Sequence, residues 1–415
     1  MRIAVIGSGI SGMAAAYYLS RKHQVFLFEK EPRLGGHTHT ITVESSKGPL
    51  AVDTGFIVHN DRNYPNLVKL FNELGVETQP SDMSFGVTCR KTGFEYSSRG
   101  LNGFFAQRRN LLRADQYQLL REILRFNREA PRLLTAPDAD SMTLGDFIEQ
   151  RRYSELFTER YLYPMACAVW SMSSETIRRF PAQTLIRFFD NHGMLGINTH
   201  PSWKVLRGGS SSYIAPLTAP FSERIQTGVE VQTVVRSETG VTLRFRDRPE
   251  MNFDQVVFSC HGNQILPLLD RPTEVERSVL NNFTTSRNEV CLHTDSALLP
   301  RHPQARASWN YNLNPVPDSG ATLTYHMNRL QSLPVPEDYC VSLNATGSVD
   351  PSKVLRRLVY YHPLYTSDAV RAQGRWSEIS GKNRTHFCGA YWFYGFHEDG
   401  LNSGLRVARA LGVEC

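Results

Sequence analysis

A short apolar run near the N-terminus leads directly into three closely spaced glycines, and no other feature constrains the fold of this chain as strongly. The run, Ile3 to Ile6, is short, largely β-branched and typical of a buried parallel strand. Gly7, Gly9 and Gly12 follow in a GxGxxG pattern, and a helix is predicted from residue 10 onward. In such a unit the first glycine makes the tight turn, the second lets the backbone approach a pyrophosphate, and the third lets helix and strand pack closely. The N-terminus therefore predicts a dinucleotide-binding βαβ unit.

The next predicted strand ends on an acid at the place where a dinucleotide site needs one. The stretch "QVFLFE" finishes at Glu29, 20 residues after Gly9, a spacing that suits an acid bound to a ribose hydroxyl. Ile10 and Ser11 open the intervening helix, where free amides and the helix dipole favour phosphate. The motif indicates a nucleotide cofactor but does not choose between NAD and FAD.

The residues after this acid carry a resemblance to a known family. The stretch "EKEPRLGGHTHT" places Arg33 before Gly35 and Gly36, and "LAVDTGFIVHN" follows. The combined pattern resembles the superfamily of flavin-dependent amine oxidases, phytoene desaturases and protoporphyrinogen oxidases. This resemblance implies FAD, with Glu29 on the adenosine ribose and the Arg33–Gly36 loop along the pyrophosphate and flavin, where a cationic Arg33 suits a diphosphate. The further cofactor contacts expected here are Lys30, His37, Thr54 and Gly55.

Later stretches, among them "YPNLVKLFNELGV", "WKVLRGGSSSYI" and "YWFYGFHEDGLNSG", extend the resemblance over almost the whole chain. The chain is most similar to a subfamily described only as predicted NAD/FAD-binding proteins. Residues 205–221, "VLRGGSSSYIAPLTAPF", look like the turn by which the family's chain returns to the FAD domain. The strand that follows touches adenine through a valine in the family, which implies this role for Val231. The final segment has the family's order of strand, turn and helix, and we expect a helix over 402–411 whose N-terminus points at the flavin. Its implied cofactor contacts are Gly389, Asp399 as helix N-cap, Gly400, Leu401 and Ser403.

Five aromatic residues lie between Tyr391 and Phe396, just before that helix. We interpret them as a wall on the substrate side of the flavin, the alternative being a plain core strand. Together with Trp309 and Tyr311, they predict an apolar substrate, and the subfamily's loose association with lipid and fatty-acyl modification agrees.

The resemblance to true amine oxidases is incomplete at two positions. Their cage tyrosine is replaced by Phe396, and the stretch 287–295, which compares with the strand carrying their lysine, contains no lysine. Two histidines become candidates because imidazole exchanges protons near neutral pH, although hydrogen-bonded structural histidines are an equal alternative. The candidate catalytic residues are His397, His293, Phe396 and Tyr394.

We expect an α/β fold with a discontinuous, Rossmann-like FAD-binding domain of the GR2 type and an α+β substrate domain. The FAD-binding domain would comprise residues 1–58, 205–270 and 382–415. The substrate domain would comprise residues 59–204 and 271–381, with the substrate bound between the domains. Since only one nucleotide motif is present, we predict an FAD-dependent oxidase or desaturase that passes a hydride from the substrate to flavin N5. An amine oxidase and a non-redox flavin-dependent isomerase or flavin-binding protein are the alternatives.

The composition argues against several other classes of protein. The chain has 415 residues, 41% hydrophobic and 21% charged, as expected for a folded protein of more than one domain. Its seven cysteines are scattered without a CxxC pair, which favours a reducing, cytoplasmic compartment over a disulfide framework or a zinc site. We expect no metal, no transmembrane helix, no signal peptide and no nucleic-acid partner.

Arginines cluster between Arg108 and Arg132, where apolar residues recur at helical spacing. This stretch predicts an amphipathic helix with a solvated basic face. The alternative is a surface for anionic lipid, which would allow peripheral membrane contact, or for an acidic substrate. The sequence does not determine the oligomeric state.

Overall fold

A five-stranded parallel sheet forms one lobe of the computed structural model, which describes residues 1–135, 142–196, 201–313 and 322–415. The strand order is β10-β2-β1-β14-β20, and every pairing is parallel. Apart from β1 and β2, neighbouring strands of this sheet come from distant parts of the chain, as in doubly wound folds. The strands are β1 (Arg2–Ile6), β2 (Gln24–Phe28), β10 (Ile225–Gln226), β14 (Gln255–Phe258) and β20 (Thr385–Phe387).

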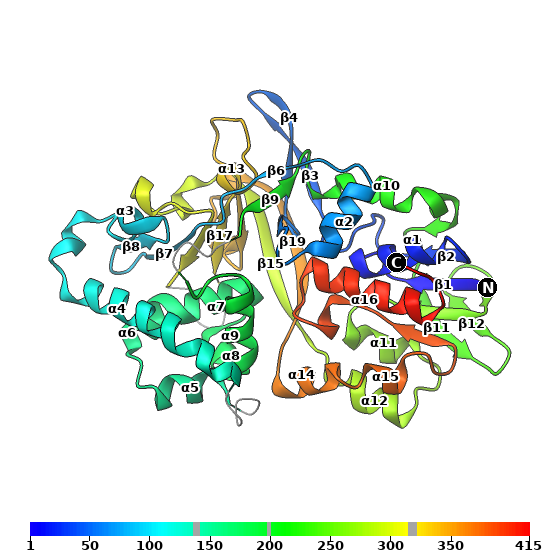
Figure 1. The fold of residues 1–415 in the computed structure, drawn as a ribbon. Helices are drawn as coiled ribbons and strands as arrows, with labels where there is room; N and C mark the ends of the chain where they lie inside the picture. Colours follow the sequence, from blue (N-terminus) through cyan, green and yellow to red (C-terminus); the bar gives the residue numbers. More distant parts are fainter. Residues whose placement is uncertain (136–141, 197–200, 314–321) are drawn as a thin grey trace.

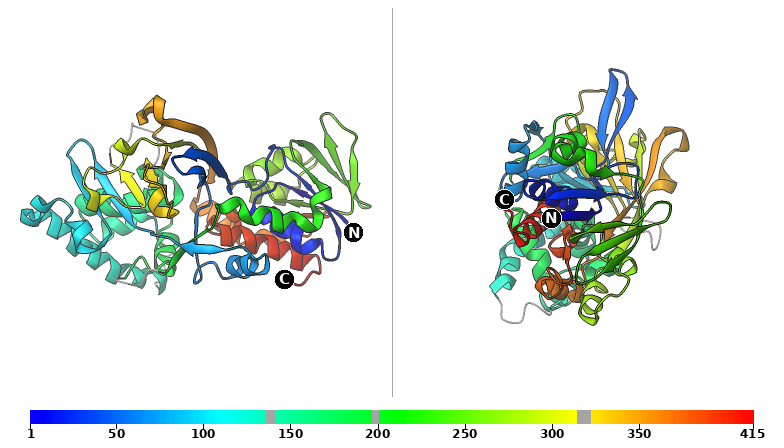
Figure 2. Two further views of the ribbon diagram at one scale, coloured as in Figure 1. Left: turned by 90° about the horizontal axis from the view of Figure 1, so that it is seen from above. Right: turned by 90° about the vertical axis from the view of Figure 1, so that its right-hand side faces the viewer.

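Two helices pack closely together on one face of this sheet. These are α1 (Ile10–Leu19) and α16 (His397–Ala410), which lie side by side in Figures 1 and 2. A Cβ added to Gly404 would lie 2.5 Å from the Ser11 carbonyl oxygen, and one added to Gly400 would lie 2.6 Å from an Ile10 methyl group. The two glycines therefore permit a helix contact that any larger residue would separate.

A seven-stranded, mostly antiparallel sheet lies in the second lobe, in the order β19-β15-β18-β17-β16-β7-β8. Only β16 and β7 pair in parallel among its described strands. Helices of residues 100–191 surround one end of this sheet and share a large apolar core with it (Figure 1). The strands are β7 (Phe85–Cys89), β8 (Phe94–Ser97), β15 (Thr285–His293), β16 (Trp309–Asn312), β17 (Leu323–His326), β18 (Cys340–Leu343) and β19 (Val354–Pro363).

Three smaller sheets and several helices complete the described chain. The hairpin β3 (Thr40–Ser45) and β4 (Gly48–Asp53) projects from the junction of the lobes (Figure 1). The other two sheets are β5 (Val58–Asn60), β9 (Trp203–Leu206) and β6 (Thr78–Pro80), and β11 (Val231–Arg236), β12 (Val241–Phe245) and β13 (Met251–Phe253). The remaining helices are α2 (Pro65–Glu73), α3 (Gly100–Phe104), α4 (Ala114–Glu129), α5 (Leu144–Gln150), α6 (Glu155–Phe157), α7 (Tyr163–Trp170), α8 (Ser174–Arg178), α9 (Ala182–Asn191), α10 (Ile214–Thr218), α11 (Gly262–Leu268), α12 (Glu274–Leu280), α13 (Met327–Leu330), α14 (Ser367–Gln373) and α15 (Trp376–Ile379).

The packing does not follow all of the expected domain boundaries. All five parallel strands lie within residues 1–58, 205–270 and 382–415. However, Leu280 of α12 and Ala369 of α14 share a core cluster with the parallel sheet, although both were expected in the substrate domain. Sequence motifs mark where a βαβ unit begins, whereas the elements that cover its faces are chosen by packing.

Two expected helices also differ in extent. The basic stretch forms a 3₁₀ turn over Arg108–Leu112 and then α4, instead of one continuous helix. The last helix, α16, begins at His397, five residues before its expected start. Among the described residues, no helix is both long and apolar enough to cross a bilayer.

Candidate functional site

The three glycines of the first turn have three different surroundings. A Cβ at Gly12 would lie 2.1 Å from the Gly7 carbonyl oxygen, and one at Gly7 would lie 3.0 Å from the backbone of Ser259 and Cys260. A Cβ at Gly9 would meet nothing within 4 Å. No described side chain caps α1, so the first amides of this helix remain available. The turn is thus closed around two glycines and open at the third, as a bound pyrophosphate requires.

Glu29 lies beside this turn at the carboxyl end of β2. Its Oε2 accepts hydrogen bonds from the amide and hydroxyl of Ser8, at 2.8 and 2.7 Å. Its Oε1 accepts one from the amide of Glu31 at 3.0 Å. A carboxylate oxygen has room for a second donor, so Glu29 fits a ribose hydroxyl. Lys30 follows it on the surface.

The loop after β2 is held together by the side chain of Arg33. Its guanidinium donates to the carbonyl oxygens of Leu34, Gly36 and Thr38, at 3.3, 2.8 and 3.1 Å. A guanidinium has five donors, and the nearby carbonyls of its own loop satisfy several of them. Arg33 therefore shapes the loop in this structure, and its contact with a diphosphate stays a prediction.

This loop lies against the open glycine. A Cβ at Gly36 would be 3.1 Å from the Cα of Gly9. A Cβ at Gly55 would be 2.0 Å from the His37 carbonyl oxygen, so the segment that carries Thr54 packs directly on the loop. A Cβ at Gly35 would be 2.6 Å from the Thr38 carbonyl oxygen. Gly36 therefore lies directly beside Gly9, and Gly35 and Gly55 allow the close packing of the loop that carries it.

Three imidazoles gather next to this surface. The His37 ring centroid lies 5.8 Å from that of His261 and 5.3 Å from that of His362. Burial lowers the pKa of His37 well below its usual value, and lowers the pKa of His261 and of His362 to about 4. All three rings are therefore neutral near pH 7. We call this group the histidine cluster.

The histidine cluster contains an unsatisfied polar atom. Nε2 of His37 is buried without a hydrogen-bond partner among the described residues. Leaving such an atom unsatisfied costs about 1–3 kcal/mol, so a polar group of a bound cofactor would fit here. Within the same described ranges, no three His, Cys, Asp or Glu side chains are placed to hold a metal ion. His261 and His362 were not identified from the sequence, although His261 lies three residues after the carboxyl end of β14, which is a recognisable position for a ligand contact.

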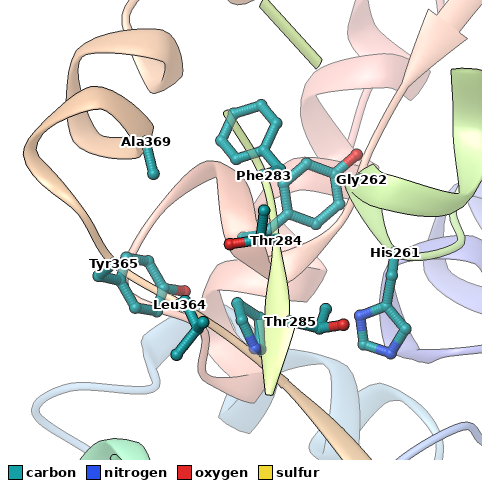
Figure 3. A pocket seen from close by; sticks show the side chains of 10 residues that line it. His261, Gly262, Phe283, Thr284, Thr285, Leu364, Tyr365 and Ala369 are labelled. Carbon is teal, nitrogen blue, oxygen red and sulfur yellow. The ribbon is translucent and has the colours of Figure 1, made fainter. Parts of the chain in front are cut away.

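Residues 33–39, the loop after β2 that we call the cofactor loop, contact the seven-stranded sheet through β19. The hydroxyl of Tyr360 lies 2.8 Å from Thr54 Oγ1 and 2.9 Å from His39 Nδ1. His362 extends from the same strand. A cavity of about 10 Å³, room for one water, adjoins this point (Figure 3). His261, Thr285 and Tyr391 are among the residues that line it.

The start of α16 differs in detail from the expected arrangement. Asp399 is the third residue of the helix instead of its N-cap, and its Oδ2 accepts the amide of Phe396 at 2.9 Å. Burial raises the pKa of Asp399 to about 7. The buried Ser403 hydroxyl accepts the amide of Gly389 at 3.0 Å, which joins the helix to the end of β20. Leu401 is fully buried in the core beneath α1.

The aromatic run before α16 divides between two environments. Tyr391 and Trp392 are 4% and 1% exposed, and both rings lie 4.8 Å from Phe283 in the core beside the parallel sheet. The wall interpretation is therefore wrong for these two residues, which are core residues. Phe396 instead stacks on Phe188 at 4.9 Å and contacts the cores of both lobes. Tyr394 lies 6.4 Å from the same phenylalanine.

His397 is brought to the cofactor loop. Its ring stacks on Phe56 at 3.6 Å, and its Nε2 lies 2.9 Å from Thr38 Oγ1 and 3.3 Å from the Tyr213 hydroxyl. Burial lowers the pKa of His397 to about 3. The ring is therefore neutral and fixed, which suits a positioning role for the loop better than proton exchange near neutral pH.

His293 is not brought to this site. Its Nε2 lies 2.8 Å from Ser342 Oγ, and its Nδ1 accepts the amide of Asp295 at 3.0 Å. It is five residues along β15 from Asn288, which pairs with Tyr360, and this separation corresponds to roughly 16 Å. Only the beginning of β15 approaches the cofactor loop, so the catalytic prediction for His293 lacks structural support.

Val231 begins β11 and is buried, 5% exposed, in the core on the other face of the parallel sheet. It shares that core with Phe28, which ends β2 one residue before Glu29. Two residues before Val231, the amide of Val229 donates to the Glu29 carbonyl oxygen at 2.9 Å, which brings the start of this segment near Glu29. The adenine contact of Val231 stays a prediction.

Comparison with known proteins identifies the family. The family model for flavin-containing amine oxidoreductases matches residues 10–355. A protoporphyrinogen oxidase of Schizosaccharomyces pombe is 25% identical over 179 residues, which are 41% of this chain and 36% of that protein. The match thus spans little more than a third of the length of this relative.

Solved structures share the fold at low sequence identity. A fatty acid isomerase from P. acnes that produces CLA aligns with a TM-score of 0.73 and 14% identity, covering 99% of both chains. Putrescine oxidase bound to putrescine aligns with a TM-score of 0.70 and 14% identity, again over 99% of both chains. Since the family model matches most of the chain, this protein belongs to the flavin-containing amine oxidoreductase family, whose members bind FAD.

Proposed function

We propose that this protein is an FAD-dependent oxidase or desaturase acting on an apolar substrate that binds between the two lobes. The observation that carries the cofactor part is the opening at Gly9, which is surrounded by Gly36 and the first amides of α1. Bound FAD would supply the hydride acceptor, and the protein would supply binding and orientation. All residue roles below belong to this proposal.

The cofactor would be held by groups of different chemistry along its length. Glu29 would bind the adenosine ribose, and Val231 would contact the adenine. The α1 amides and the Gly9–Gly36 surface would bind the pyrophosphate. The histidine cluster would complete the polar contacts, because His37 Nε2 is buried without a described partner.

The start of α16 would face the flavin ring, where helix amides favour negative charge. Asp399 holds this turn by accepting the Phe396 amide. The pKa of Asp399, about 7 because of burial, makes it a group that can hold or release a proton near neutral pH. It is therefore a better candidate for proton transfer than His397, whose pKa burial lowers to about 3.

The apolar substrate is supported by the residues at the junction of the lobes. Phe396 stacks on Phe188, and Phe188 in turn stacks on His192 at 3.9 Å. The pKa of His192 is lowered by burial to about 4, so its ring is neutral and adds no charge beside Phe188. Amine oxidation is less well supported, because Phe396 replaces the expected tyrosine and β15 contains no lysine.

A second candidate is a flavin-dependent isomerase without net electron transfer. The fatty acid isomerase that shares the fold favours this alternative over a carrier without catalysis. A fold supports several chemistries, so activity must decide between them.

The test is an absorption spectrum of the purified protein, followed by anaerobic titration with fatty acids, protoporphyrinogen and amines. The proposal expects flavin bands and loss of the band near roughly 450 nm, typical of oxidised flavin, on addition of an apolar compound. Bleaching by amines alone would overturn the substrate class. Product formation without bleaching or oxygen consumption would support the isomerase, and a colourless protein that does not bind FAD would overturn the proposal as a whole.

A further inference from the structure

Exposed apolar side chains are concentrated at one end of the molecule. Ten large apolar residues are exposed among the described residues, and five of them lie between residues 101 and 124. Leu112 is 93% exposed and Leu101 is 67% exposed. The other three are Leu111, Tyr117 and Leu124. Because scattered surface leucines are ordinary but clustered ones mark interaction sites, this end of the molecule requires an explanation.

These residues share a surface that we call the α3–α4 tip, residues 100–128. The buried face of α4 carries Gln116, Leu119, Glu122 and Phe126. Its outward stripe carries Tyr117, Arg121, Leu124 and Arg128, at helical spacings of four, three and four residues. Figures 1 and 2 place α3 and α4 at the end of the molecule farthest from the parallel sheet.

The tip is held in a fixed shape by contacts between its elements. The Tyr117 hydroxyl donates to the Leu111 carbonyl oxygen at 2.9 Å, and its ring lies 5.5 Å from that of Phe105. Arg108 donates to the Phe105 carbonyl oxygen at 3.1 Å. The exposed leucines before α4 therefore keep a defined position beside the outward stripe of the helix.

This tip and the residues next to it have a strong local excess of positive charge. Residues 98–132 contain eight arginines and three acids, a net charge of +5, whereas the whole chain has +6. The three acids are already engaged, since Asp115 pairs with Arg113, Glu129 pairs with Arg125, and buried Glu122 accepts the Ser154 amide. The other arginines, all exposed and with no carboxylate partner among the described residues, are Arg99, Arg108, Arg109, Arg121, Arg128 and Arg132.

An open groove of about 610 Å³ runs along the same side of α4. Tyr117, Leu120 and Leu124 line it together with Arg121 and Arg128. Alternating apolar and cationic side chains match the boundary between lipid headgroups and acyl chains. They do not match a second copy of this chain, whose own charge is also positive.

We propose that the α3–α4 tip docks on the surface of an anionic lipid bilayer. Leu101, Leu111 and Leu112 enter the interface, and the exposed arginines bind the headgroup phosphates. This proposal does not depend on the cofactor or on the reaction, because the tip is built entirely from the helical end of the second lobe.

The test is co-sedimentation of the full-length protein with vesicles of phosphatidylcholine alone or mixed with phosphatidylglycerol. We expect binding to the mixed vesicles that weakens as salt concentration rises and little binding to phosphatidylcholine alone. Leu112→Asp should reduce binding at least tenfold, and Arg121→Glu with Arg128→Glu should abolish it. Each variant is first checked for an unchanged thermal unfolding temperature.

Two matched controls lie on the other lobe. Val275, 42% exposed on α12, and Arg271, with a 95% exposed side chain, should tolerate Val275→Asp and Arg271→Glu without loss of vesicle binding. The proposal is overturned if the wild type ignores anionic vesicles, if it binds both vesicle types equally, or if the controls are as damaging as the tip variants. A concentration-dependent dimer that disappears in Leu112→Asp, without vesicle binding, would instead make the tip an interface between copies.

Discussion

The glycine turn at residues 7–12 and the aromatic run at residues 391–396 are both patterns from which the flavin site is predicted, but they differ in how far sequence determines their roles. Each glycine has a role fixed by backbone geometry within a few residues, and the contacts of Gly7, Gly9 and Gly12 agree with those roles. The aromatic residues have no such local constraint. Their directions depend on distant partners, Phe283 for Trp392 and Phe188 for Phe396. Backbone motifs are therefore safer indicators of a site than side-chain composition.

Trp392→Ala tests this contrast with the largest expected effect on stability. Trp392 is 1% exposed and packs on Phe283, so the substitution should lower the free energy of unfolding by about 3–5 kcal/mol. Phe396→Ala is the matched variant and should lower the free energy of unfolding by about 1 kcal/mol, because this ring is only half-buried. It should also change the rate at which substrate reduces the flavin. Chemical denaturation and anaerobic reduction measure the two effects. Equal losses of stability would show that the aromatic run is one structural unit.

Gly12→Ala should destabilise the protein by about 3 kcal/mol, since the new Cβ would lie 2.1 Å from the Gly7 carbonyl oxygen and strain a packed backbone. Chemical denaturation of the cofactor-free protein measures this loss directly. A variant with wild-type stability would mean that α1 does not pack on the turn as the structure describes.

Gly9→Val should leave folding intact and remove the cofactor. Gly9 has φ −63° and ψ 171°, which valine adopts readily, and its Cβ would meet nothing within 4 Å. The side chain would fill the space needed by the pyrophosphate, so FAD affinity should fall at least about a hundredfold, or ~2.7 kcal/mol. Fluorescence titration with FAD gives the affinity, and circular dichroism checks the fold. Full retention of FAD would place the cofactor elsewhere.

Much of the fold could be predicted because the first βαβ unit combines several local signals. Glu29 and the parallel pairing of the first two strands follow from spacing and residue type. The start of α16 could also have been found, because Glu398 and Asp399 place two acids in its first turn. The contacts of the Arg33 guanidinium could not be predicted from the sequence, because its acceptors are carbonyl groups that come together only in the folded loop.

The position of His293 shows a different limit. Its strand, β15, was recognised from a resemblance, but only the folded sheet reveals which end of that strand approaches the cofactor loop. The same register brings Tyr360 and His362 of β19 to the loop, although no local pattern marks either residue. Long-range pairing therefore decides which polar side chains belong to the site.

The histidine cluster predicts a pH dependence of stability and of FAD binding. Burial lowers the pKa of His261 and of His362 to about 4, whereas a histidine in the unfolded chain has a pKa of about 6.5. The two neutral histidines therefore contribute fully to the stability of the folded state above about pH 6.5. This contribution is lost as the pH falls toward 4, because the unfolded chain then binds protons that the folded state does not. The unfolding temperature of the cofactor-free protein should fall over this interval.

An anionic diphosphate next to the histidine cluster would oppose the effect of burial on the pKa of these histidines. It would raise the pKa of the neighbouring imidazoles, so FAD binding would take up protons and FAD affinity would increase as the pH falls below neutrality, by up to about tenfold per pH unit for one proton. Calorimetry in buffers of different ionisation enthalpy measures the uptake, and His37→Gln should reduce it, although Arg33 and His397 also act on His37. FAD affinity that does not change with pH would place an uncharged part of the cofactor at the cluster, which would then satisfy His37 Nε2 by a neutral hydrogen bond.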